Sequence, residues 1–136
     1  MLQEILFNTP KHIVLGKMLD TAALKQRVIS ANIANVGTPG YQRLGVVFQD
    51  ELVRALGAGA NRLSTTHPNH IPGSSRLMNA APEVVLIDDG YFNGVNNVNI
   101  EEEMVELGKN QLDFDTAAQF IKNDFTDLRA AIRGGR

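Results

Sequence analysis

Residues 99–133 read NIEEEMVELGKNQLDFDTAAQFIKNDFTDLRAAIR and carry the clearest structural pattern in the chain. Apolar side chains recur there at alternating steps of three and four residues, which is the heptad pattern of a coiled-coil helix. We therefore predict one long C-terminal helix with an apolar seam. The seam, interrupted only by the polar Gln111, comprises Met104, Leu107, Gln111, Phe114, Ala118, Ile121, Phe125, Leu128 and Ile132.

The two ends of this segment carry the residues that helix ends favour. Asn99 can cap the first turn, and Glu102, three residues later, can complete a capping box. The run Glu101–Glu103 places negative charge at the positive end of the helix dipole, and Arg129 and Arg133 place positive charge at the other end. These signals predict a helix that begins just after Asn99 and ends before Gly134 and Gly135.

A second heptad pattern lies near the N-terminus. Thr9 is a candidate N-cap, and Pro10 fits the first helical turn, where its missing N–H is not needed. The sequence Gly37-Thr38-Pro39-Gly40 ends the pattern, so we predict a long helix from Thr9 to about Val36. Its seam comprises Leu15, Leu19, Ala22, Gln26, Ile29, Ile33 and Val36.

The segment between the two helices, residues 37–98, is more irregular. The spacing of Phe48, Leu52 and Leu56 predicts a short amphipathic helix closed by Gly57. Residues 57–82 have no period. The apolar stretch 83–87 and the turn signals at 88–90 and 93–94 predict short extended segments within 83–98.

The predicted fold is mainly α, with two long terminal helices packed as a coiled-coil hairpin and an irregular, partly β middle region. The corresponding segments are 1–36 and 99–136 for the helices and 37–98 for the junction and middle. Two helices alone bury little apolar surface. We therefore expect the seams to pack on each other, on neighbouring subunits, or on both, in an obligate assembly.

Composition excludes several classes of protein. A net charge of −2 gives no basic surface of the kind that binds nucleic acid. No apolar run approaches the length of about 18 residues that a membrane span requires. The first ten residues include Glu4 and lack a basic start before an apolar core, so we expect no Sec-type signal peptide. The absence of cysteine excludes disulfides and thiolate metal sites.

No residue pattern predicts catalysis, a cofactor or a metal. His67 and His70 lack a third ligand and are separated by Pro68, so a loop or packing role is favoured. Asp88-Asp89-Gly90 is typical of a turn, and the carboxylates Glu101–Glu103 are explained by their place at a helix start. Asp113 and Asp115 fall on different helix faces and are expected to be solvated. We predict a non-enzymatic protein with no small-molecule substrate.

The end of the first helix reads Ala31-Asn32-Ile33-Ala34-Asn35-Val36-Gly37-Thr38-Pro39-Gly40-Tyr41. This stretch resembles the N-terminal signature of flagellar axial proteins, the rod, hook and hook-associated subunits. The junction residues carried by the resemblance are Asn32, Ala34, Asn35, Thr38, Pro39, Gly40 and Tyr41. Physically, the two asparagine amides can bond a neighbouring backbone or the helix-end carbonyls, and Tyr41 can anchor the departing chain. An ordinary helix C-cap uses similar residues, so the resemblance rests on the whole match.

Within that family the short chain is similar to subunits of the proximal rod. Further matching features are Val46-Val47-Phe48, Leu63 with Thr66 and His70-Ile71, Val98, and Asn110-x-Leu112-x-Phe114. The segment 93–98 departs from the family's usual Asp-Gly-Asn, and Gly37 stands where an acidic or polar residue is usual. These departures leave a sister proximal-rod subunit as an alternative.

The resemblance implies a structural subunit of the flagellar basal body that forms a hollow drive shaft and transmits torque. It also implies export by the flagellar type III apparatus without a cleaved signal and a periplasmic location in the rod. The implied partners are other rod proteins, copies of the chain itself and an adaptor on the export-gate side. A cytosolic coiled-coil adaptor or chaperone is the competing class, because it would share the two seams.

Overall fold

The structure is a computed structural model that describes residues 10–57 and 78–134. Its elements are α2 (Pro10–Ala34), β1 (Leu44–Val47), α3 (Gln49–Gly57), β2 (Glu83–Leu86) and α5 (Ile100–Ile132). The candidate cap Thr9, the histidines His67 and His70, and the middle of the aperiodic segment lie outside the described residues.

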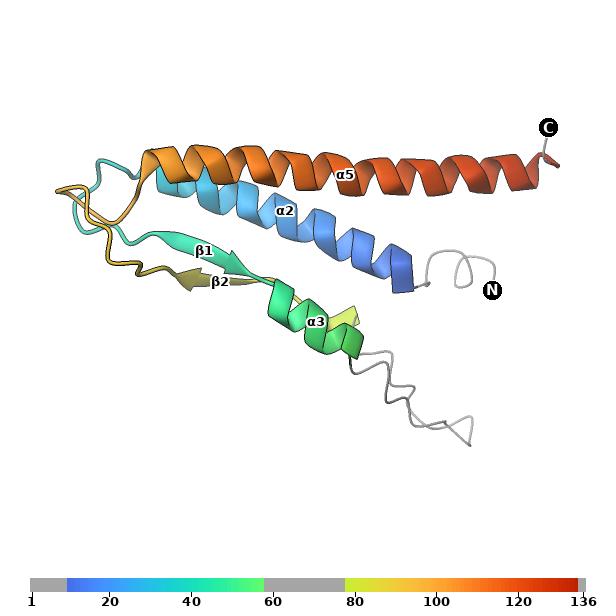
Figure 1. Cartoon of the computed structure of the whole chain (residues 1–136), viewed down its shortest axis with the longest axis horizontal. Helices are drawn as coiled ribbons and strands as arrows, with labels where there is room; N and C mark the ends of the chain where they lie inside the picture. Colours follow the sequence, from blue (N-terminus) through green and yellow to red (C-terminus); the bar gives the residue numbers. More distant parts are fainter. Residues whose placement is uncertain (1–9, 58–77, 135–136) are drawn as a thin grey trace.

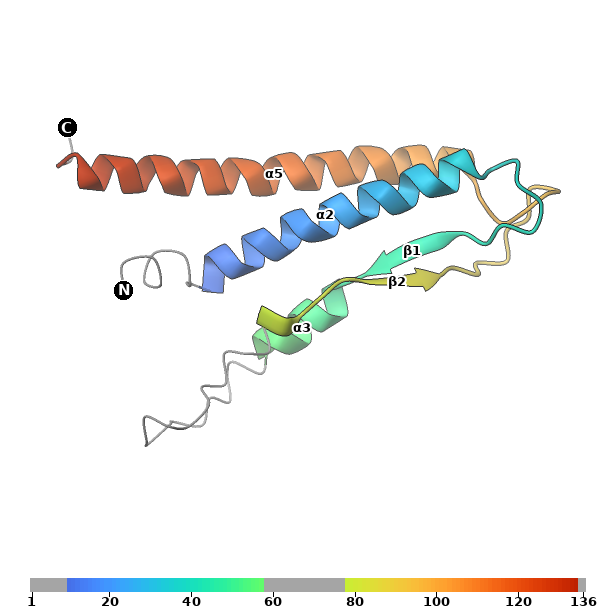
Figure 2. The ribbon, with the colours of Figure 1, turned by 180° about the vertical axis from the view of Figure 1, so that it is seen from behind.

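The two long helices form an antiparallel pair (Figure 1). Helix α5 continues past the N-terminal end of α2, and β1, β2 and α3 lie along the other side of α2 (Figure 2). Lys11 and Asp124 join the pair near one end at 2.6 Å, and Asn32 and Glu103 join it near the other at 3.1 Å. The predicted mainly α fold, with long terminal helices packed together, is confirmed.

The helix ends follow the local sequence signals. Pro10 is the first residue of α2. Asn99 caps α5 by accepting a hydrogen bond from the Glu101 N–H at 3.0 Å, as predicted. Glu102, however, accepts a hydrogen bond from Arg43 at 3.1 Å, so its carboxylate is drawn to the junction between the helices.

The face of α5 that meets α2 lies beside the predicted seam and includes its half-buried members Leu107, Ala118, Ile121 and Leu128. Its buried residues are Glu103, Asn110 and Ala117, at intervals of seven. Asn110 donates to the Ala22 carbonyl at 2.9 Å and to the Gln26 Oε1 at 3.2 Å. Ala117 is small, and Glu103 and Asn110 are hydrogen-bonded to α2, so all three can be buried in the contact.

The matching line on α2 is Leu15, Ala22 and Ile29, which are all buried. These three belong to the predicted N-terminal seam, so periodicity identified the buried side of α2. Of the other seam residues on α2, Leu19 and Ile33 are half-buried.

The middle region contains one strand that the sequence analysis missed. β1 pairs with β2 in antiparallel register, with Leu44 opposite Leu86 and Val47 opposite Glu83. The extended stretch at 83–86 was predicted, but residues 87–99 form an irregular loop, which corrects the wider expectation of strands within 83–98. β1 contains glycine and spans four residues, so its own pattern is weak.

Helix α3 confirms the predicted short amphipathic helix. Phe48, Ala55 and Ala80 form a small buried cluster, and Leu52 packs against it. This cluster joins α3 to the segment that leads into β2.

Candidate assembly interface and junction

Asn32 is the centre of a buried hydrogen-bond network at the end of α2. Its side chain is 1% exposed. Its Nδ2 donates to the Leu44 carbonyl at 2.8 Å, and its Oδ1 accepts from the Leu44 N–H at 3.0 Å. The amide thus bonds both backbone groups of Leu44, as a neighbouring strand would. This pair of bonds fixes β1 against α2.

The same amide contacts α5 and the departing chain. Nδ2 of Asn32 also donates to Glu103 Oε2 at 3.1 Å, and Oδ1 accepts from the Tyr41 hydroxyl at 3.1 Å. One side chain therefore connects α2, the turn after it, β1 and α5. Replacing it leaves several buried polar groups without a partner.

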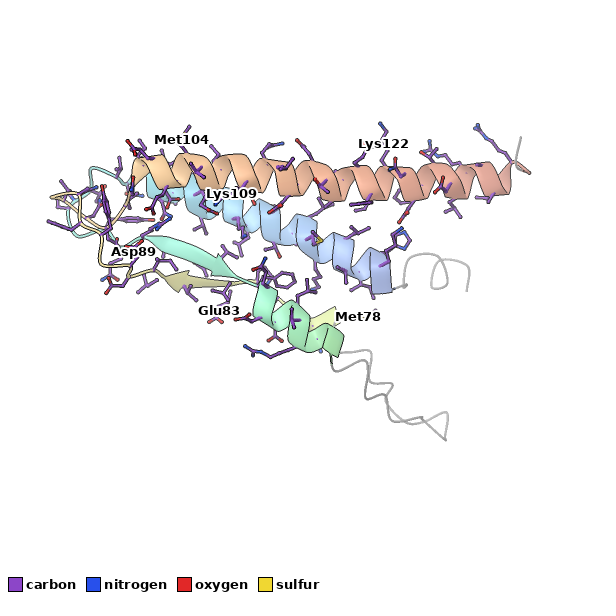
Figure 3. All side chains as sticks on the ribbon, viewed as in Figure 1. Met78, Glu83, Asp89, Met104, Lys109 and Lys122 are labelled. Carbon is purple, nitrogen blue, oxygen red and sulfur yellow. The ribbon has the colours of Figure 1, made fainter. Side chains whose placement is uncertain are left out.

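Arg43 and Glu103 form a largely buried ion pair beside Asn32. Arg43 Nε donates to Glu103 Oε1 at 2.6 Å, and their side chains are 14% and 2% exposed. Arg43 Nη1 also contacts Asp89 at 2.9 Å and Glu102 at 3.1 Å. Figure 3 shows Asp89 on the loop that follows β2. Arg43 therefore draws α5 and the loop together around one cation.

The charges of this cluster shift nearby pKa values. Burial lowers the pKa of Arg43, but the hydrogen bond and negative charge of Glu103 more than offset it, so the pKa is raised overall. Burial, with the charge of Glu103, raises the pKa of Tyr41 above 10.0. The Tyr91 backbone N–H, with the charge of Arg43, holds the pKa of Asp89 below its usual value. Arg43 and Asp89 thus favour their charged forms, and Tyr41 favours its neutral form.

Asn96 caps the C-terminal end of α2 from the loop before α5. It is 3% exposed, and its Nδ2 lies 2.9–3.0 Å from the carbonyls of Asn35, Val36 and Thr38. These carbonyls follow the last helical turn, and those of Asn35 and Thr38 also accept from backbone N–H groups of the turn. A side chain 60 residues away in sequence thus supplies the cap of the helix.

Asn93 and Asn97 hold this loop in shape. Asn93 Oδ1 accepts from the N–H groups of Val95 and Asn96, and its Nδ2 donates to the Val98 carbonyl at 2.9 Å. Asn97 bridges the Arg43 N–H at 2.7 Å and the Ile87 carbonyl at 2.6 Å. The segment that departs from the usual family pattern therefore closes the junction.

The residues predicted from the junction motif have different roles. Asn35 donates from Nδ2 to the Ala31 carbonyl at 2.8 Å, and its Oδ1 accepts from the Thr38 hydroxyl at 3.1 Å. Gly40 adopts φ 74° in the turn, where glycine is favoured. Ala34 and Pro39 are exposed. The motif therefore combines one buried anchor, Asn32, with residues that shape the turn.

The predicted seam of α5 is only partly covered within the chain. Leu107, Ala118, Ile121 and Leu128 are half-buried. The remaining apolar members are exposed: Met104 by 55%, Phe114 by 40%, Phe125 by 39% and Ile132 by 75%. Packing of the whole seam by neighbouring subunits stays a prediction.

Comparison with known proteins bears on this arrangement. The chain is similar to the flagellar basal body rod protein FlgB of Bacillus subtilis (strain 168), with 32% identity over 124 residues that cover 90% of this chain and 92% of the relative. The chain belongs to the FlgB family of flagellar basal body rod proteins.

Other FlgB proteins are similar over comparable lengths. The protein from Borrelia hermsii is 33% identical over 86% of this chain and 91% of its own length. The protein from Escherichia coli (strain K12) is 26% identical over 86% of this chain and 88% of its own length. The family model for the flagella basal body rod protein matches residues 19–42, which span most of α2 and the following turn.

Membership of the FlgB family makes this chain a structural component of the flagellar basal-body rod, which assembles with other basal-body proteins. None of the helices within residues 10–57 and 78–134 is long and apolar enough to cross a membrane. The same residues contain no cluster of three or more histidine or acidic side chains suited to a metal ion.

Sequence reasoning missed three of the residues that hold this FlgB-family junction: Arg43, Glu103 and Asn96. Glu103 was interpreted only as a helix-start charge, whereas it is a buried partner of Arg43. One signal pointed to it: Glu103, Asn110 and Ala117 are spaced by seven, in register with a heptad. Nothing local distinguishes Asn96 from its asparagine neighbours.

Proposed function

We propose that this chain is a subunit of the proximal rod whose terminal helices form part of a hollow drive shaft between motor and hook. The observation that carries the proposal is the incomplete cover of α5. A helix that is fixed at one end by a buried network leaves Met104, Phe114 and Ile132 in water. Exposed apolar side chains of this kind are expected to be covered by neighbouring subunits.

The junction supports a mechanical role. Torque that passes along a rod places load on the connections between its helices. In this chain, α2, α5 and β1 are joined by short hydrogen bonds of charged and amide side chains at Asn32, Arg43 and Glu103. Such bonds are directional and resist sliding more than apolar contacts do. We propose that residues 37–98 are an appendage to this helical core.

The proposed partners are copies of the chain, other rod proteins and an adaptor on the export-gate side. The proposed route is export through the flagellar type III apparatus to a periplasmic rod, without cleavage of a signal. Kinship with FlgB proteins over about 90% of the chain supports this proposal. It also disfavours the coiled-coil adaptor, which has no need of the junction motif.

The test combines purification and reconstitution. Basal bodies isolated from the producing bacterium should contain the full-length chain with its N-terminal residues intact, and deletion of the chain should prevent rod and hook assembly. The purified chain should gain far-UV helicity and form large particles when it is mixed with the other proximal-rod proteins. A chain that is absent from basal bodies and ignores those proteins would contradict the proposal.

A further inference from the structure

Asn93-Gly94 is the one place in the sequence where glycine follows asparagine. In an unfolded chain such a pair is where asparagine deamidates fastest, because glycine has no side chain to shield its backbone nitrogen or to restrict the backbone around it. The pair lies in the loop between β2 and α5, at the end of the molecule where α2 ends (Figure 1). Both residues are exposed, so water reaches them in the folded chain as well.

The reaction of this pair needs only water as a co-reactant. The backbone nitrogen of Gly94 attacks Cγ of Asn93 and closes a cyclic imide, and Nδ2 leaves as ammonia with the proton that Gly94 gives up. Water then adds to one of the imide carbonyls and opens the ring. Opening on one side gives aspartate. Opening on the other side gives isoaspartate, in which the main chain runs through the side-chain methylene.

In the folded chain the Asn93 amide is held at both ends. Its Oδ1 accepts from the N–H groups of Val95 at 2.8 Å and Asn96 at 2.9 Å. Its Nδ2 donates to the Val98 carbonyl at 2.9 Å and to Asn96 Oδ1 at 3.2 Å. The Asn93 N–H also donates to the Asn96 carbonyl at 2.9 Å. These bonds fix both the side chain and the backbone of Asn93.

Attack on Cγ requires these bonds to break. The attack turns the planar amide into a tetrahedral carbon, so Oδ1 and Nδ2 cannot both stay in the positions that their partners hold. Nδ2 must also give up its two acceptors before it leaves. The loop therefore has to open before the ring can close, and the rate follows the fraction of chains in which the loop is open.

The turn explains why a reactive pair stands at this position. Gly94 has φ 95°, which lies in the left-handed region that glycine adopts without strain. A Cβ at Gly94 would meet nothing within 4 Å, so the backbone conformation, and not a lack of space, requires glycine. Asn93 supplies an acceptor and a donor to the loop, whereas an ionised aspartate supplies acceptors alone.

We infer that Asn93 is a spontaneous modification site that the unfolded chain exposes and the folded junction closes. Aspartate places a carboxylate oxygen where Nδ2 was, facing the oxygens of Val98 and Asn96. Isoaspartate lengthens the backbone inside the turn. Either product weakens the loop that carries Asn96, whose amide caps α2. A chain that reacts before it folds carries a damaged junction, and a chain that folds first is protected.

The first test compares the full-length chain in urea and in a stabilising osmolyte, at the same pH and temperature. The osmolyte is added until the far-UV helix signal reaches a plateau, and mass spectrometry follows the replacement of NH2 by OH at residue 93. Conversion should be about tenfold slower, or slower still, in the osmolyte. A synthetic peptide of residues 88–98, which lacks the helices, should react at similar rates in the two solvents.

Two pairs of variants test the role of the hydrogen bonds. Asn96→Ala removes an acceptor of Asn93 Nδ2, so it should speed conversion at Asn93 several-fold in the osmolyte, whereas Asn123→Ala on α5 should not. Asn93→Asp should lower the ratio of folded to unfolded chain about tenfold in urea unfolding. Its matched control, Asn123→Asp, keeps the acceptor that Gln119 uses and should have little effect.

Equal rates in urea and at the osmolyte plateau would overturn the inference. Faster conversion in the folded chain would overturn it too, because the N–H groups of Val95 and Asn96 would then stabilise the oxyanion of the attack and would not act as a clamp. An Asn93→Asp chain as stable as the unaltered chain would contradict the damage to the junction.

Discussion

The substitution Glu103→Gln tests the buried junction with the smallest change of shape. It keeps the length of the side chain and removes its charge. Glu103 Oε1 accepts from Arg43 at 2.6 Å, and Oε2 accepts from Asn32 at 3.1 Å. A glutamine has one acceptor and one donor in those two places. Whichever way the glutamine amide turns, its NH2 group must face an N–H group of either Arg43 or Asn32.

Asn32 cannot relieve this conflict by rotating its own amide. Its Nδ2 and Oδ1 are both engaged by the backbone of Leu44, so a flip would break both of those bonds. Removing one member of a buried ion pair costs about 3–5 kcal/mol. Arg43 keeps its contacts with Asp89 and Glu102. We therefore expect Glu103→Gln to lower the free energy of unfolding by about 3 kcal/mol, at the lower end of that range.

The measurement is urea unfolding followed by far-UV circular dichroism, with a fixed amount of stabilising osmolyte in every sample. The control is Glu106→Gln, the same change one turn later in α5. Glu106 pairs with Lys109 at 2.7 Å on the surface, so we expect a loss below about 0.5 kcal/mol. Equal losses in the two variants would refute the claim that Glu103 is a buried anchor.

A double-mutant cycle sharpens the result. Arg43→Met removes the other half of the pair, and the double variant should lose less stability than the sum of the two single losses. Strict additivity would mean that the 2.6 Å contact between Arg43 and Glu103 carries no coupling.

Three further predictions concern other parts of the junction. Asn96→Ala removes the amide that donates to three helix-end carbonyls, which keep weaker or turn-type donors, and it should lower the free energy of unfolding by about 1 kcal/mol in urea. Gly45→Ala places a Cβ 2.7 Å from Cγ1 of Ile87, so it should lower the free energy of unfolding by about 1–3 kcal/mol. Adding Ile87→Ala to that variant should recover part of the loss. In a Tyr91→Phe background, the phenol absorbance of Tyr41 should titrate above pH 10.0. Because the folded-state pKa is raised, the stability from Tyr41 is full below pH 10.0 and is lost as pH rises through the folded value.

Each of these predictions has its own control. Asn123→Ala changes an exposed asparagine of α5 and should have little effect on the free energy of unfolding. A loss equal to that of Asn96→Ala would contradict a special role for Asn96 as the cap of α2. Gly108→Ala meets nothing within 4 Å and should stabilise α5 by about 0.5–1 kcal/mol, so a loss there would contradict the steric argument. For the titration, a Tyr41 midpoint at its ordinary value would contradict the influence of burial and Glu103.

Local patterns in the sequence were sufficient for the helices. Pro10, Asn99 and the heptad spacing set the position of α2 and α5, because helix formation depends on neighbours three and four residues apart. The short helix α3 and the strand β2 were predicted for the same reason. β1 was missed because its glycine-containing stretch takes its structure from pairing with β2 and from the amide of Asn32.

Which face of α5 meets α2 was decided only by the tertiary structure. The predicted line ran through Met104 and Phe114. The fully buried residues are Glu103, Asn110 and Ala117, whereas Leu107, Ile121 and Leu128 of the predicted line are half-buried. Periodicity finds an apolar stripe, and it does not distinguish packing inside the chain from surface left for a neighbour. The exposed stripe follows from the fold, because hydrogen bonds to α2 hold the polar line inward.

The sequence alone thus determined the three helices and β2 of this protein, its family resemblance and the absence of familiar catalytic motifs. The tertiary structure decided how Arg43, Glu103 and Asn96 meet Asn32 and the end of α2. Arg43 and Glu103 lie 60 residues apart, Asn32 and Glu103 lie 71 apart, and Asn96 and Val36 lie 60 apart. A hydrogen bond over such a distance leaves no periodic trace in the chain. Only the folded backbone brings such groups to within 3.1 Å of each other.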